Sequence, residues 1–137
     1  MFTTLHLAFF ILVVPAIIFA DHMGFKYFTG RVQTLDARHI RWAHRAVMTG
    51  LLLLIISGVM IVAGNWAVWF EKPLFYAKLA LVATVALNGF FIHSLMMKAT
   101  VAPYAALTSE ERRLLLVSGA LSAIGWVGSA VIGYFGL

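Results

Sequence analysis

Five histidines are the side chains of this 137-residue chain best suited to chemistry: His6, His22, His39, His44 and His93. Imidazole can exchange a proton near neutral pH, and in its neutral form it binds iron, copper and zinc. His44 and His93 draw the most attention because each lies at the edge of a long apolar run. Ionisable side chains are costly inside a membrane and therefore mark candidate functional sites there.

The spacing around these two histidines favours a cofactor site. Met48 follows His44 by one helical turn, and Gly89 precedes His93 by one turn. Two histidines on facing helices of a bundle can hold a haem iron axially, and the small Gly89 leaves space beside them. The sequence therefore predicts a b-type haem site in which His44 and His93 bind the metal, with Met48 and Gly89 beside the cofactor.

Other interpretations of the same pair stay open. His44 and His93 could be interfacial residues that extend toward lipid headgroups. A zinc site would need a third or fourth ligand, which His22 or Asp21 could supply. A proton relay is a further alternative.

A second ionisable pair is expected near the opposite membrane face. His6 lies near the start of the first apolar run, and Lys78 lies one to two turns into the third. Lys78 could reach the interface by extending its side chain. Alternatively, His6 and Lys78 form a functional pair that binds an anionic group such as a porphyrin propionate.

Several classes of chemistry are excluded by what the sequence lacks. It contains no cysteine, which rules out disulfides, thiolate metal sites, iron–sulfur clusters and cysteine nucleophiles. It also contains no nucleotide-binding glycine loop and no HExxH or GxSxG motif. The net charge of +5 arises from basic residues in short segments between apolar runs, which is typical of membrane loops and not of a nucleic-acid groove.

Composition identifies the elements that must position these residues. Hydrophobic residues make up 63% of the chain and charged residues 11%, whereas a soluble domain carries about 25% charged residues. A membrane-spanning helix needs about 20 mostly apolar residues. The sequence predicts one all-α membrane domain over residues 1–137, a four-helix transmembrane bundle with short loops and helices at about 3–20, 43–64, 73–97 and 109–136.

Local signals support these helix limits. Asp36 or Thr34 can cap a helix that begins before the membrane. Pro73 suits the first turn of the third helix, and Thr108 with Glu111 has the spacing of a capping box. Pro15 is expected to kink the first helix. No Lys or Arg precedes this helix, so we expect a retained helix and not a signal peptide.

Charge predicts the orientation. Five of the ten Lys and Arg residues lie around the first connection and three around the third, against two at the second connection. The positive-inside rule then places both termini outside the cytoplasm. The residues of the basic side are Lys26, Arg31, Arg38, Arg41, Arg45, Lys98, Arg112 and Arg113.

The fourth helix carries small residues at spacings of three or four: Ser118, Ser122, Gly125, Ser129 and Gly133. Small residues let membrane helices approach closely. We expect a packing seam within the bundle or with a second copy of the chain. A pathway for a polar substrate is the alternative.

A resemblance to known proteins adds to this interpretation. The stretch Leu5-His6-Leu7, the opening of the third helix over Pro73–Val82 and the segment Asn88–His93 resemble small four-helix bacterial membrane proteins related to the HemJ-type protoporphyrinogen oxidases and the CopD group. The resemblance implies b-type haem, His6 and Lys78 as the catalytic pair, and a multi-pass protein of the bacterial inner membrane.

Three functional hypotheses follow. The first is a haem-binding membrane protein for electron transfer or porphyrin oxidation, and thus a candidate haem-dependent oxidoreductase. The second is a structural or accessory subunit of a larger membrane complex, without chemistry of its own. The third is a small transporter, which would need a homo-oligomer because four helices are few. In each case the lipid bilayer is the expected partner, and no nucleic acid is.

Overall fold

Four long helices make up most of the chain in a computed structural model, which describes residues 1–136. They are α1 (Phe2–Phe28), α2 (Ala37–Ala63), α4 (Pro73–Lys98) and α5 (Ser109–Val131). Three short elements complete the fold: α3 (Trp66–Phe70), a 3-10 turn η1 (Tyr104–Ala106) and a π-helical turn η2 (Ile132–Gly136). The predicted all-α, four-helix fold is confirmed.

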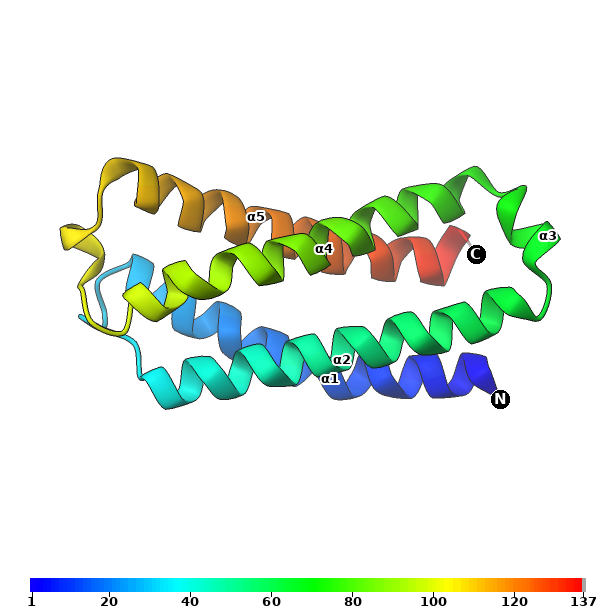
Figure 1. Ribbon diagram of the computed structural model, residues 1–137, viewed down its shortest axis with the longest axis horizontal. Helices are drawn as coiled ribbons and strands as arrows, with labels where there is room; N and C mark the ends of the chain where they lie inside the picture. The colour runs from blue at the N-terminus through cyan, green and yellow to red at the C-terminus, as the bar shows by residue number, and fades with distance from the viewer. Residues whose placement is uncertain (137) are drawn as a thin grey trace.

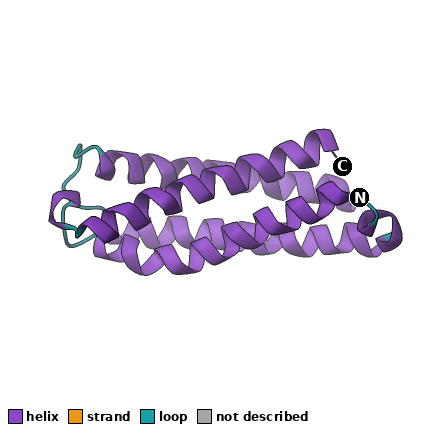
Figure 2. Ribbon diagram, turned by 90° about the horizontal axis from the view of Figure 1, so that it is seen from above, coloured by secondary structure: helices purple, strands orange, loops and turns teal. Residues whose placement is uncertain are grey.

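The helices form two antiparallel hairpins that lie side by side. α1 packs along α2, and α4 packs along α5, while α2 and α4 provide the principal helix contact between the hairpins (Figure 1). Both termini lie at one end of the bundle, which we call the terminal end (Figure 2). The connections over residues 29–36 and 99–108 lie at the other end, which we call the basic end.

The outer surfaces of the helices are suited to lipid and not to water. All four long helices are long and apolar enough to cross a membrane. Large apolar side chains project from them into the surroundings; Leu12 is 73% exposed, Phe91 78% and Ile124 61%. Contiguous apolar surface of this extent is not found on soluble monomers. The chain is therefore an integral membrane protein.

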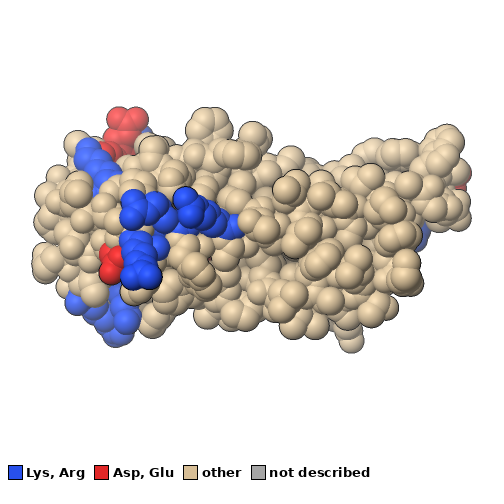
Figure 3. All heavy atoms as spheres, turned by 60° about the horizontal axis from the view of Figure 1, so that its bottom comes forward, with Lys and Arg blue, Asp and Glu red and all other residues tan. Residues whose placement is uncertain are grey.

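Charged side chains gather at the basic end. Figure 3 shows Lys and Arg concentrated there, with a long uncharged stretch beyond them. Eight of the ten Lys and Arg residues belong to this end, and Lys72 and Lys78 belong to the terminal end. These are the residues from which the orientation was predicted, so the cytoplasmic placement of the basic end stays a prediction.

The predicted cap signals operate as expected. The Asp36 carboxylate accepts hydrogen bonds from the backbone N–H groups of Arg38 at 2.8 Å and His39 at 3.4 Å, and α2 begins at Ala37. These bonds hold the pKa of Asp36 below its usual value. Thr108 and Glu111 form the capping box of α5.

Two helix limits and one short helix differ from the prediction. The second helix begins at Ala37 and not at about residue 43, in keeping with the Asp36 cap. The first helix continues to Phe28, about two turns beyond the predicted end at residue 20, because its last turns are held by packing outside the apolar run. Met23 and Tyr27 lie buried in a cluster with loop residue Leu35, and the Tyr27 hydroxyl donates to the Ala102 carbonyl at 2.7 Å. The short helix α3 was not predicted.

The small-residue seam of α5 is used inside the bundle. A Cβ atom at Gly125 would overlap Val85 Cγ2, and one at Gly133 would lie 2.9 Å from Lys78 Nζ. Both contacts are with α4, so these seam residues pack against a helix of the same chain.

This close approach predicts a large difference between two glycines of α5. Gly125→Leu forces α4 and α5 apart and should lower the free energy of unfolding by about 1–3 kcal/mol, as overpacking does. Gly119→Leu is the matched control, because no atom lies within 4 Å of a Cβ there. Unfolding in mixed detergent micelles measures both, and equal stability of the two variants would contradict the packing seam.

Candidate functional site

His44 and His93 meet face to face inside the bundle. His44 lies in the second turn of α2, and His93 lies in the last two turns of the antiparallel helix α4. Their ring centroids are 4.2 Å apart, with 31° between the ring planes. Both side chains are partly buried. The alternative that each histidine extends separately toward headgroups does not describe this arrangement.

One nitrogen of this pair is buried without a hydrogen-bond partner. His93 Nδ1 is buried and unbonded within the described residues. A buried imidazole nitrogen without a partner carries a desolvation cost of about 1–3 kcal/mol. Such an atom is free to accept a proton, a metal or a ligand hydrogen.

The two other predicted cofactor-binding residues lie one turn away. A Cβ atom at Gly89 would be 2.7 Å from the Met48 sulfur, so the thioether rests directly on the glycine. The structure thus brings together His44, Met48, Gly89 and His93 at one level of the bundle. Only a residue without a side chain permits this approach of Met48 to α4.

These residues line a largely apolar cavity of about 480 Å³ between the two hairpins. This volume falls in the range of small-molecule and cofactor sites, about 300–1,000 Å³. α1 contributes Asp21 and Gly24 to the lining, and α5 contributes Gly119 and Ser122. The cavity is therefore bordered by all four long helices, and the histidine pair belongs to its wall.

A polar pair fixes the two helices behind the cavity. The Asn88 side-chain amide donates to the Ser118 carbonyl at 3.0 Å, and the Ser118 hydroxyl donates to Asn88 Oδ1 at 2.7 Å. Both residues also line the cavity. In lipid there is no water to hydrogen-bond these polar groups, so such interhelical bonds satisfy them. This reciprocal bond holds α4 and α5 in register beside His93.

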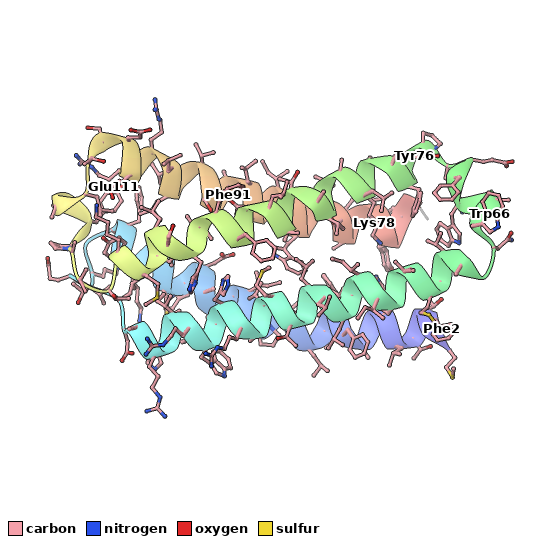
Figure 4. All side chains as sticks on the ribbon, viewed as in Figure 1. Phe2, Trp66, Tyr76, Lys78, Phe91 and Glu111 are labelled. Carbon is pink, nitrogen blue, oxygen red and sulfur yellow. The ribbon has the colours of Figure 1, made fainter. Side chains whose placement is uncertain are left out.

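The second predicted pair lies at the terminal end. His6 Nδ1 is 2.7 Å from the Ser57 hydroxyl, which itself donates to the Leu54 carbonyl at 3.1 Å. His6 and Ser57 thus form one hydrogen bond between α1 and α2, and the imidazole tautomer decides which of the two donates. Lys78 is partly buried and points toward the space between the hairpins, with its Nζ close to Gly133 (Figure 4).

An apolar cluster separates the two polar sites. It contains side chains from all four long helices, namely Val13, Leu51, Leu54, Val85 and Trp126. His44 and Ser57 are 13 positions apart on α2, or about 20 Å along the helix axis. The pair His44–His93 and the residues His6 and Lys78 therefore belong to different sites, and one small cofactor cannot contact both.

A zinc site of ordinary composition is not formed. Such a site needs three or four protein ligands. Within residues 1–136, no three side chains of the His, Asp and Glu type gather closely enough to hold a metal ion. Within this part of the chain, neither His22 nor Asp21 therefore joins the histidine pair as the zinc alternative would need. The pair can offer two imidazoles, which is the number that an iron porphyrin uses axially.

Comparison with known proteins identifies no relative. No family model, no curated protein and no solved structure matches the chain. The function of the chain is therefore inferred from the geometry of the site alone.

The histidine pair could be predicted from the sequence, but the polar residues that hold the neighbouring helices were not predicted. Asn88 was noted only as part of a segment, although an amide in the middle of an apolar helix is a signal of an interhelical bond. Ser118 was assigned to the small-residue seam, where its hydroxyl had no predicted role. Ser57, the partner of His6, has no signal beyond its polarity in an apolar run.

The reciprocal bond can be tested through one hydroxyl. Ser118→Ala leaves Asn88 Oδ1 without its donor, so the free energy of unfolding should fall by about 0.6–1.7 kcal/mol, the range of interhelical bonds in membranes. Ser94→Ala is the control, because the exposed Ser94 hydroxyl makes only a 3.4 Å contact with a carbonyl of its own helix. If both variants unfold alike, the Asn88–Ser118 bond does not hold α4 against α5.

Proposed function

We propose that this chain is a b-type haem-binding protein of the membrane that transfers electrons. One observation carries the proposal: two imidazoles from facing helices meet in the wall of an apolar cavity. Haem, when bound, supplies one-electron redox chemistry. The residues of the chain would hold the iron with His44 and His93 and surround the macrocycle with apolar side chains.

The surroundings of the pair fit this group. The cavity wall is mostly aliphatic and aromatic, as the faces of a porphyrin require. His93 Nδ1 is buried without a partner among the described residues, so an iron or a propionate could satisfy it. The flexible Met48 side chain occupies the space over Gly89, so a ligand could displace it without moving the backbone of α4. The two imidazoles favour a ligand that carries one metal, and the apolar walls of the cavity favour a flat, apolar ligand.

The contact between the rings sets a condition. With centroids 4.2 Å apart, the imidazoles leave no room for an atom between them. For both histidines to hold one metal, the rings would have to separate, either by a change of rotamer or by spreading of the hairpins. Spreading would open the contact between α2 and α4, which is the principal helix contact between the hairpins.

Electron transfer is favoured over porphyrin oxidation. A catalytic role of His6 and Lys78 was implied by resemblance alone, and these residues lie about 20 Å from the histidine pair along the helices. A substrate at the terminal end would not contact a cofactor at His44 and His93. The pair His6–Ser57 is instead a satisfied hydrogen bond between α1 and α2.

The two other hypotheses have less support. The accessory-subunit hypothesis relied on the seam of α5 and on the lack of a strong motif. The seam gives it less support, because Gly125 packs against α4 of the same chain. The transporter hypothesis needs a polar path, whereas the central cluster around Leu54 and Trp126 closes the middle of the bundle with apolar side chains.

Absorption spectroscopy tests the proposal directly. The detergent-purified protein should show a Soret band, either as isolated or after addition of haemin. His44→Ala and His93→Ala should each weaken haemin binding by about tenfold or more, because even outer partners of metal ligands contribute 10–100-fold. His39→Ala is the control, since His39 lies on the exposed side of α2. No Soret band under either condition, or equal binding by all three variants, would overturn the proposal.

The cavity itself can be tested without touching a histidine. No atom lies within 4 Å of a Cβ at Gly119, so Gly119→Trp can place an indole in the cavity without a clash at its Cβ. Haemin titration should show binding weakened by about tenfold or more, while the unfolding transition is retained. Unchanged haemin affinity in this variant would place the ligand outside the cavity.

A further inference from the structure

A groove of about 370 Å³ lies on the membrane-facing side of α1 and α2, away from the histidine pair. Apolar side chains make up most of its wall: Phe9, Leu12, Val13 and Leu53. The polar members, Arg45 and Thr49, come from α2, and Trp42 lies beside them. The groove therefore combines an apolar trough with one cationic group.

Arg45 lies farther along α2 from the basic end than the other arginines of this helix. It follows the first residue of α2 by eight positions, or about 12 Å along the axis. Its side chain is exposed. Within residues 1–136 the only salt bridge joins Lys98 and Glu111, so no carboxylate of this part of the chain neutralises Arg45.

Neighbouring residues mark the level of the headgroups. Arg38, Arg41 and Arg45 follow one another on α2 at spacings of three and four, which places them along one side of the helix. A line of basic side chains runs from the basic end toward the middle of this face (Figure 3). Trp42 is 57% exposed and packs edge-on against Phe19, as an indole at the interface does.

We propose that the α1–α2 groove binds one anionic phospholipid. Its phosphate would accept hydrogen bonds from the Arg45 guanidinium, with Arg41 one turn closer to the interface. One acyl chain would lie in the trough along Leu12 and Leu53. Guanidinium matches phosphate as a paired donor, and basic sites of this kind on membrane helices select anionic headgroups. The site is independent of haem binding, because it lies on the other side of α2.

The groove favours one bound lipid over a general attraction of Arg45 to headgroups. Arginine on a smooth helix would extend to any phosphate of the surface. Here the trough gives an acyl chain a fixed contact area immediately below the cation. A close crossing of the helices shapes it, since a Cβ atom at Gly50 would overlap Val13.

Native mass spectrometry of the detergent-purified full chain tests this site, with phosphatidylglycerol, phosphatidylcholine and inorganic phosphate as separate probes. Phosphatidylglycerol should be retained at one molecule per chain. Arg45→Gln should weaken its retention by about tenfold, the loss expected for one charge-assisted hydrogen-bonded pair. Arg113→Gln is the matched control, because Arg113 is exposed on α5 and its replacement removes the same charge.

Two further variants keep the test decisive. Thr49→Trp fills the trough and leaves Arg45 in place, so it should reduce phosphatidylglycerol retention without changing the net charge. Arg45→Lys keeps the charge but loses the paired donors, and should give an intermediate affinity if Arg45→Gln fails to fold.

Three results would overturn the proposal. Equal losses in Arg45→Gln and Arg113→Gln would show general attraction to headgroups. Equal retention of phosphatidylcholine would show that the groove does not select charge. Binding of inorganic phosphate as tight as that of phosphatidylglycerol would show that the trough contributes nothing. None of these measurements depends on haemin, so their failure leaves the haem proposal to its own test.

Discussion

The cost of a polar group in hydrocarbon governs this structure. Backbone N–H and C=O groups cannot be left unbonded in lipid, so every spanning segment must be a helix or part of a closed barrel. The chain forms four long helices, and short connections join them at the two ends of the bundle. The same cost explains why most of its charges collect at the ends and why His44 and His93 lie together inside the bundle.

Lipid also changes what holds the helices together. Apolar burial contributes little between helices, because acyl chains are as apolar as Leu. Close contact at Gly125 and the reciprocal bond between Asn88 and Ser118 therefore join α4 to α5. Between the hairpins the contacts are fewer, and the cavity beside His44 and His93 lies there. The helices therefore pack closely within each hairpin, and the cavity lies between the two hairpins, where the packing is looser.

Much of this could be predicted from the sequence, since hydropathy and end signals act locally. The spans, the capping box at Thr108 and the meeting of His44 with His93 follow from run lengths and from the antiparallel order of neighbouring helices. What could not be predicted depends on tertiary packing. The extension of α1 to Phe28 requires the cluster around Tyr27, and the partner of His6 depends on the rotation of α2 about its axis. Periodicity fixes which residues share a face, but not which neighbour that face meets.

The position of the central apolar cluster limits what the bundle can do. Trp126 of α5 and Leu54 of α2 meet at mid-height with side chains from the other two long helices. Packed apolar side chains therefore lie between the pair His6–Ser57 and the cavity at the basic end. A redox group at His44 and His93 would exchange electrons through the basic end or through the cavity border formed by α1 and α5. It would be shielded from the terminal end by packed apolar side chains, which favours a partner on the side where the basic loops lie.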